Sequence, residues 1–299
     1  MPKRRIFTDI EINGIIDLYK NNKTIRDIYG FYKTSYEKIV SVLKENNILI
    51  RDSIDYISVG HGRKYYCNED VFEKIDSHDK AYWLGFLLAD GCVHSSKSGA
   101  TSPSNVSIAL QEGDFVHLHN FLKFIESDYN VKFVEQEYHG KQTKSCRASV
   151  YSKKMAQDLI NVGCIPRKSL VLEYPKNIDE EYFPSLLSGY FDGDGCLTFS
   201  KSELGHISNS VGLMGSYAFL FEVSEKLKKY GIESKSIKKK HGIYFFNIAN
   251  KHFSKFYNLV YGKSDYFLER KRNKFRDMLD FRHEEFIIND NQSIFRYLY

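Results

Sequence analysis

The sequence of 299 residues lacks the features that mark several common classes of protein. Its five cysteines, Cys67, Cys92, Cys146, Cys164 and Cys196, contain no C-x-x-C pair, so neither a zinc site nor a disulfide framework is indicated. A reducing compartment is therefore expected, most simply the cytoplasm. No apolar run approaches the ~20 residues of a membrane helix. The N-terminal Met-Pro-Lys-Arg-Arg lacks the apolar segment of a secretory signal.

A strong charge of one sign is also missing. The chain carries 43 Lys and Arg against 38 Asp and Glu, a formal net charge of +5, which permits nucleic-acid binding without demonstrating it. A hydrophobic content of 42% is ample for well-packed cores. The length predicts two or three domains or subdomains.

Two stretches of the chain are copies of one short motif, residues 83–91 and 187–195. Each is an apolar run with a glycine at its third position, Gly85 or Gly189, and each ends in Asp-Gly. The final aspartates, Asp90 and Asp194, lie roughly one hundred residues apart. An apolar segment that stops on a carboxylate is unusual, because burying an unpaired charge is costly. The repetition predicts a duplicated fold with paired acids at a pseudo-twofold axis.

The motif also predicts how its two copies meet. Small residues four apart share one face of a helix, so two such helices can approach backbone to backbone. Gly91 and Gly195 follow the acids, where we expect each helix to end in a left-handed residue. Asp90 and Asp194 would then lie at adjacent helix C-termini, whose dipoles add negative potential to two carboxylates. A divalent cation is the natural partner, and oxygen ligands in an open, hydrated site favour Mg²⁺, with Mn²⁺ as a substitute.

With these residues, the sequence resembles the LAGLIDADG homing endonucleases in their single-chain, two-repeat form, over roughly residues 79–283. The resemblance implies that Asp90 and Asp194 are the catalytic, metal-binding acids, with Ala89 and Gly193 beside them in the metal site. Leu88 replaces the first Asp of the motif in the first copy, whereas Asp192 keeps it in the second. That position is not the essential acid of the family.

The periodicity after each motif predicts the same order of elements twice. In the first copy, strands 92–97 and 105–111, helix 114–125, strands 131–138 and 147–151, and helix 153–162 follow the motif. The second copy repeats this order through residue 279. We therefore expect an α+β protein of two pseudo-symmetric αββαββα repeats, residues 79–178 and 179–283, whose antiparallel saddle sheets bind DNA. A tail, residues 284–299, would follow.

The first 51 residues predict a separate all-α domain. Thr8 and Glu11 have the spacing of a capping box, and apolar residues then recur at helical spacing in three short segments. Three short helices joined by tight turns are typical of a helix-turn-helix DNA-binding module, with a plain three-helix packing domain as the alternative. Residues 52–78 read as a polar linker.

Three further residues are candidates for catalysis. Lys168 and Lys271 each follow the second helix after the motif of their own copy, and they resemble in place the basic residues that family members hold near the active site. A lysine there would stabilise charge or position water; the alternative is a surface lysine. Gln111, at the end of a strand, could position water. The second copy has Gly215 near that place, so we expect the two half-sites to differ.

Basic and amide side chains on two-stranded ribbons would enter the major groove and neutralise phosphates. The DNA-binding candidates of the two repeats are Lys97, Lys132, Lys141, Lys144, Arg147, Lys201, Lys235, Lys238, Lys239, Lys240 and His241. Those of the N-terminal module are Arg26, Lys33, Ser35, Tyr36, Lys38 and Lys44, and those of the linker are Arg63 and Lys64. For the linker residues and the Lys238–Lys240 run, a merely solvated segment is an equal alternative.

The function expected from these features is site-specific hydrolysis of both strands of duplex DNA. We expect a monomer that binds a double-stranded DNA target and no membrane. The chain has no N-terminal Cys or Ser and no terminal His-Asn, so a free-standing or intron-encoded protein is expected rather than an intein. The alternative is a DNA-binding transcription regulator or an RNA-splicing maturase built on the same fold.

Overall fold

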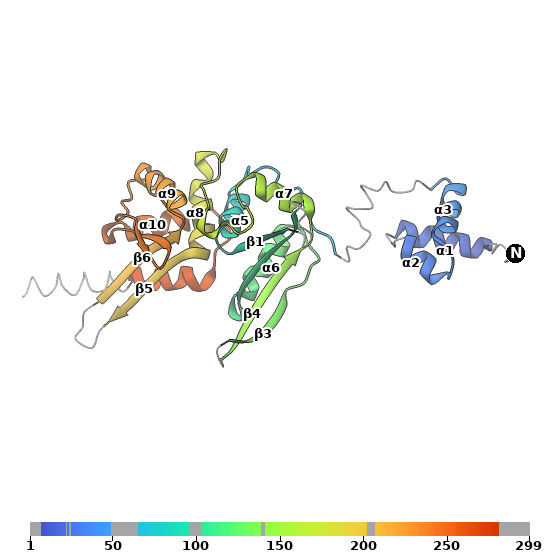
Figure 1. Cartoon of the computed structure of the whole chain (residues 1–299), viewed down its shortest axis with the longest axis horizontal. Helices are drawn as coiled ribbons and strands as arrows, with labels where there is room; N and C mark the ends of the chain where they lie inside the picture. The colour runs from blue at the N-terminus through green and yellow to red at the C-terminus, as the bar shows by residue number, and fades with distance from the viewer. Residues whose placement is uncertain are drawn as a thin grey trace, which may run out of the picture. The chain divides into compact units, whose positions relative to one another are not determined.

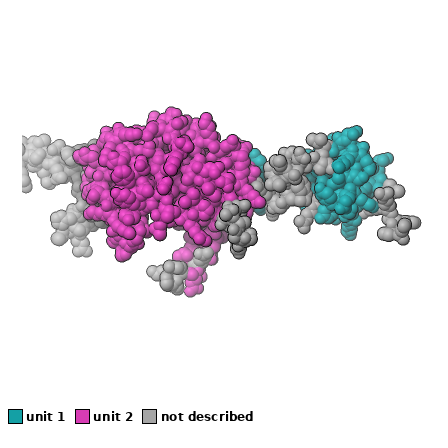
Figure 2. All heavy atoms as spheres, turned by 45° about the horizontal axis from the view of Figure 1, so that its top comes forward, with its two compact units in different colours: residues 1–66 teal, residues 67–299 magenta. Residues whose placement is uncertain are grey.

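The chain forms two compact units, residues 1–66 and residues 67–299 (Figure 2). The computed structural model describes residues 7–21, 23, 25–48, 65–95, 103–138, 141–201 and 207–280. Arg63, Lys64 and Lys97, residues 52–64 of the predicted linker and the predicted tail lie outside these ranges. Of Arg26, Lys141 and Lys201, only the backbone is described.

The first unit consists of helices α1 (Asp9–Lys20), α2 (Ile25–Phe31) and α3 (Tyr36–Glu45). The predicted capping box starts α1: the Glu11 amide donates to Thr8 Oγ1 at 3.3 Å, and the Thr8 amide donates to Glu11 Oε2 at 2.9 Å. Apolar residues from all three helices, including Ile15, Ile28 and Ile39, are fully buried together. An all-α N-terminal unit is therefore present, as predicted.

The second unit begins earlier than the sequence predicts. Cys67, Val71, Phe72 and Ile75 are buried in its main core, although the pattern assigned them to a polar linker. They precede the motif helix in the chain and pack with it, so the folded unit starts near residue 67. Short segments of this kind lack the length for a clear period, which is why the sequence reads as a linker there.

The two motif helices, α5 (His78–Ala89) and α8 (Phe183–Asp194), lie side by side at the centre of the second unit (Figure 1). A methyl group at Gly85 would lie 2.0 Å from the Leu186 carbonyl oxygen, and one at Gly189 would lie 1.9 Å from that of Tyr82. Only glycine fits at either position, because each helix backbone rests directly on the other. The predicted close approach through small residues is confirmed.

Each motif helix leads into a four-stranded antiparallel sheet. In the first repeat the strands are β1 (Gly91–Ser95), β2 (Pro103–Gln111), β3 (Lys132–Tyr138) and β4 (Lys141–Val150), in the order β1-β2-β4-β3. In the second they are β5 (Gly195–Lys201), β6 (Ile207–Gly215), β7 (Lys238–Lys240) and β8 (Ile243–Asn247), in the order β5-β6-β8-β7. The equivalent strand orders confirm the duplication.

Helices cover one face of each sheet. In the first repeat these are α6 (Phe115–Phe124), which follows the short turn η1 (Glu112–Asp114), and α7 (Lys153–Asn161). In the second repeat α9 (Tyr217–Lys229) packs on β6 and β8, and α10 (Phe253–Val260) packs on α8. Residues 269–280 form one more helix. This is the predicted α+β fold, with the architecture that the resemblance to the LAGLIDADG family implies.

The ends of the motif helices differ from the prediction in one detail. Gly195 has φ −75° and ψ 141°, and Gly91 is not among the described residues with positive φ. Both glycines already begin a strand, so neither is left-handed. A methyl group at Gly195 would lie 2.2 Å from the Phe191 carbonyl oxygen. Glycine is required because the strand turns back closely over the last turn of its own helix.

Candidate active site

Asp90 and Asp194 come together at the adjoining ends of the two motif helices. Asp90 is the C-cap of α5 and Asp194 is the last residue of α8. A methyl group placed on Gly193 would lie 2.3 Å from Ala89 Cβ and 3.3 Å from Asp90 Oδ2. The helix ends are therefore in direct contact, and the Asp90 carboxylate lies against the last turn of α8.

The electrostatics of this pair are unfavourable in the protein alone. Burial, and then the Asp90 charge, raise the pKa of Asp194 to about 6. Burial also raises the pKa of Asp90, against the opposing effect of Lys271, Lys168 and Arg270. Two acids with raised pKa values that share a site are typical of a place built to receive positive charge.

Lys168 and Lys271 both lie beside this pair rather than on the surface. Lys168 opens η2 (Lys168–Leu170), is buried, and donates from Nζ to the Gly91 carbonyl oxygen. Lys271 is equally buried and donates to the carbonyl oxygens of Phe191 at 2.8 Å and Gly195 at 2.7 Å. Each lysine thus bonds to the C-terminal end of the motif of its own repeat, as their equivalent positions in the sequence predict.

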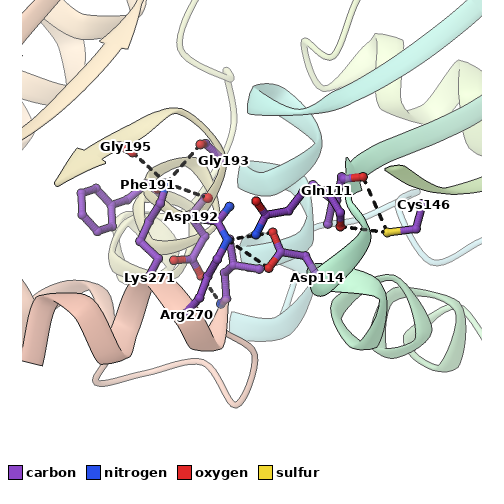
Figure 3. Close-up of polar contacts among 11 residues, drawn as sticks. Gln111, Asp114, Cys146, Phe191, Asp192, Gly193, Gly195, Arg270 and Lys271 are labelled. Atoms are coloured by element: carbon purple, nitrogen blue, oxygen red, sulfur yellow. Dashed lines mark hydrogen bonds and ion pairs between the residues drawn. The ribbon is translucent and has the colours of Figure 1, made fainter. Parts of the chain in front are cut away.

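Lys271 also has a clear structural role. Its Nζ lies 2.8 Å from the Asp192 carbonyl oxygen and 3.1 Å from that of Gly193, so it caps the C-terminus of α8 (Figure 3). Burial lowers the pKa of Lys271 to about 8, while the nearby carboxylates, led by Asp192, oppose that change. The ammonium charge of Lys271 is therefore stabilised both by the carbonyl oxygens at the end of α8 and by the nearby carboxylates.

Asp192 was not predicted to have a role, yet it is the most extensively hydrogen-bonded acid beside the site among the described residues. This carboxylate is fully buried and accepts three hydrogen bonds: from Tyr82 Oη at 2.8 Å, Tyr261 Oη at 2.9 Å and the Leu268 amide at 2.7 Å. Burial raises the pKa of Asp192 to about 6, and these donors lower it. An acid inside an apolar helix was the available signal, but its partners are distant in the chain.

Gln111 and Gly215 end equivalent strands, and the two places differ as predicted. Gln111 is exposed at the end of β2, and its carbonyl oxygen accepts a hydrogen bond from Cys146 Sγ at 3.2 Å. In the second repeat, Tyr190 Oη would lie 2.4 Å from a methyl group on Gly215 and donates to the Met214 carbonyl oxygen at 2.8 Å. The tyrosine occupies the space that a side chain would need there.

The predicted basic residues of the sheets divide between two faces. Lys132 lies opposite Arg147 of β4, and Gln111 lies opposite Ser145 of the same strand. Since residues two apart on a strand point to the same face, all four side chains share the face opposite the helices. Lys238 and Lys240 occupy the corresponding face of the second sheet, through pairing with Phe245 and Ile243. Lys144 lies on the other face and pairs with Glu135 at 3.1 Å, and Lys239 lies 5.2 Å from the centre of the Tyr244 ring.

The other DNA-binding candidates belong to segments that are distant in sequence from Asp90 and Asp194. Lys235 is exposed next to β7, and His241 is exposed in the turn after it. In the first unit Lys33, with φ 48°, occupies the turn before α3, and Ser35 is the N-cap of that helix. Tyr36 and Lys44 are exposed on α3, and Lys38 is half-buried.

The donors present fit a hard divalent cation. Among the described residues, no cluster of three or more His, Cys, Asp or Glu side chains could hold a metal. A cation here would depend on the two carboxylates and on oxygens from backbone, water or substrate, which is the type of ligand set that Mg²⁺ accepts. Ala89 and Gly193 can offer only carbonyl oxygens, and that of Gly193 already accepts from Lys271.

Comparison with known proteins gives distant likenesses. No family model matches the sequence. DNA-directed RNA polymerase subunit Rpo1C of Methanocaldococcus jannaschii is 24% identical over 147 residues, 49% of this chain but only 16% of that protein. The homing endonuclease I-WcaI bound to its DNA recognition sequence has a TM-score of 0.49 and 17% identity, covering 76% of this chain and 98% of that one.

I-DmoI in complex with DNA and Ca has a TM-score of 0.42 and 17% identity, covering 64% of this chain and 90% of that one. Within the described residues, no helix is both long and apolar enough to cross a membrane.

Proposed function

We propose that the protein is a site-specific DNA endonuclease of the LAGLIDADG type that cuts both strands of its target. The observation that carries the proposal is the pair Asp90 and Asp194 at the joined ends of two packed motif helices, each with a raised pKa. A pseudo-twofold arrangement of two acids suits two equivalent reactions on two antiparallel strands.

The chain's own groups divide the work as follows. Asp90 and Asp194 would hold divalent metal, Mg²⁺ in our proposal, which when bound supplies activation of water and of the scissile phosphate. Lys168 and Lys271 lie next to the acids and offset negative charge that develops on the phosphate. Gln111, on the open sheet face, positions water in the first half-site. Gly215 offers no such group, so the half-sites are inequivalent.

The open faces of the two sheets are the proposed DNA-binding surface. They carry Lys132 and Arg147 in the first repeat and Lys238 and Lys240 in the second, on the faces opposite the helices. Lys144 and Lys239 lie on the helix-covered faces and are the weaker candidates. Contacts to phosphates would make binding strongly dependent on salt.

The N-terminal unit is proposed as a second DNA-reading module. Its α2 and α3 are joined by a four-residue turn, residues 32–35, with Ser35 and Tyr36 at the start of α3. A short turn before an exposed helix N-terminus is the arrangement with which helix-turn-helix proteins contact base edges. Lys33 and Lys44 would contact the backbone of the duplex.

A library experiment tests the proposal without knowledge of the target. The protein is incubated with Mg²⁺ and a plasmid library of random inserts, and linear products are sequenced; a protein carrying both Asp90→Asn and Asp194→Asn is the control. We expect one enriched insert sequence with the wild type and none with the control. If no linear product forms but the protein retains one insert sequence selectively when the library is recovered with it, the regulator or maturase alternative is favoured instead.

A further inference from the structure

The segment that delivers Lys271 to the active site is held from two sides. Residues 261–268 connect α10 to the final helix and contain two donors to Asp192: Tyr261 Oη at 2.9 Å and the Leu268 amide at 2.7 Å. The final helix begins directly after Leu268. Arg270 then reaches across to the first repeat, where its Nε donates to both carboxylate oxygens of Asp114, at 3.0 and 2.8 Å (Figure 3).

The Asp114–Arg270 pair is asymmetric in its exposure. The Asp114 side chain is only 5% exposed, whereas that of Arg270 is 51% exposed. A buried carboxylate depends on its cation far more than a half-exposed guanidinium depends on its anion. The ion pair therefore holds Arg270 against Asp114 of the first repeat, and Lys271, the next residue in the chain, is held in position with it.

The segment that delivers Lys168 has a matching anchor of a different kind. Ser216 of the second repeat donates from Oγ to the Leu172 carbonyl oxygen, just beyond η2. Asp114 and Ser216 occupy equivalent positions, each directly before the helix that follows the second strand, α6 or α9. Each lysine segment is thus fastened to the opposite repeat, by an ion pair in one case and a neutral hydrogen bond in the other.

We propose that Asp114 and Arg270 are positioning residues for the half-site of Lys271, which couple its geometry to the first repeat. This inference rests on the proposed endonuclease function. Without the pair, the segment keeps its bonds to Asp192 but loses its outer attachment, so Lys271 moves relative to the paired acids. Misplacement of a catalytic group by about 1 Å can cost ~10²-fold in rate. The half-site of Lys168 keeps its own anchor and is unaffected.

The test measures the cutting of each strand separately. Asp114→Asn removes the charge of the buried partner and leaves without its anion only the half-exposed Arg270 guanidinium, which water can solvate, so the protein still folds. Target duplex labelled on one strand or the other is cut in single-turnover assays at saturating protein. We expect one strand to be cut ~10²-fold more slowly, the other within about twofold of wild type, and nicked plasmid to accumulate. Ser216→Ala, the matched variant, should spare the strand that Asp114→Asn slows.

Several results would overturn the inference. Equal slowing of both strands by Asp114→Asn would show a general structural role, and unchanged rates on both strands would show no role. Arg270→Gln must slow the same strand as Asp114→Asn, since the two residues act as one pair. If wild-type protein with Mg²⁺ cuts no duplex, the proposed function itself fails, and the inference falls with it.

Discussion

Replacing Asp194 by asparagine should stabilise the metal-free protein at neutral pH while removing its activity. Asp194 has its pKa raised from the ordinary 3.8 to about 6, by burial and then by the Asp90 charge. Because the folded state holds its proton more tightly than the unfolded chain, wild-type stability is lost as the pH rises through this interval. The loss corresponds to about 3 kcal/mol when the interval is converted at ~1.4 kcal/mol per pH unit.

Asparagine does not titrate, so the variant escapes this loss. In EDTA, the free energy of unfolding of Asp194→Asn should exceed that of wild type by up to about 3 kcal/mol at pH 7.5, and the excess should vanish near pH 4. Denaturant titrations monitored by the fluorescence of Trp83, which is buried in the core of the second unit, would measure it. Asp179→Asn, at an exposed aspartate, is the matched control.

Adding metal should reverse the order. A divalent cation that binds only the folded wild type stabilises it by ~2.7 kcal/mol at a hundredfold excess over Kd, whereas the variant gains little. The reasoning is refuted if Asp194→Asn is less stable than wild type at pH 7.5 in EDTA. It is also refuted if the difference between the two proteins is the same at pH 7.5 and pH 4.

Four further predictions test other parts of the account. Lys168→Met should slow cleavage by ~10²–10³ with target affinity unchanged in gel-shift assays, while the exposed Lys176→Met cuts normally. Gly189→Ala should destabilise the second unit by ~1–3 kcal/mol or more, because its methyl group meets the Tyr82 carbonyl oxygen at 1.9 Å; Gly113→Ala, which meets open space, should not. Deleting residues 1–51 should weaken target affinity at fixed salt yet leave a folded, Mg²⁺-dependent nuclease. The apparent affinity for Mn²⁺, measured calorimetrically, should fall as the pH drops through about 6, because protons compete for Asp194.

The parts of the fold that sequence predicts well are those with a local cause. The motif helices, the capping box at Thr8 and the hairpins follow from spacing within about ten residues, where periodicity and turn chemistry are direct signals. The duplication added a second, independent check on each element. The packing of Gly85 and Gly189 also followed, since small residues at helical spacing have few other purposes in an apolar run.

What the sequence could not supply depends on contacts between distant segments. Asp192 stands out as an acid in an apolar helix, but its three donors lie at Tyr82, Tyr261 and Leu268, which no local pattern connects. The Asp114–Arg270 pair joins the two repeats in the same way. The sequence placed Gly195 in a left-handed conformation from a general rule of helix ends, and the immediate start of β5 overrides that rule.

The measurement that tests the central claim most directly is double-strand cleavage by Asp90→Asn and Asp194→Asn, each alone, on the target found by library selection. With Mg²⁺ present, we predict that neither variant yields linear plasmid, while both bind the target with near wild-type affinity in gel shifts with Ca²⁺. Linear product at the wild-type rate from either variant would contradict the account, because it would show that the paired acids are not the site of the reaction.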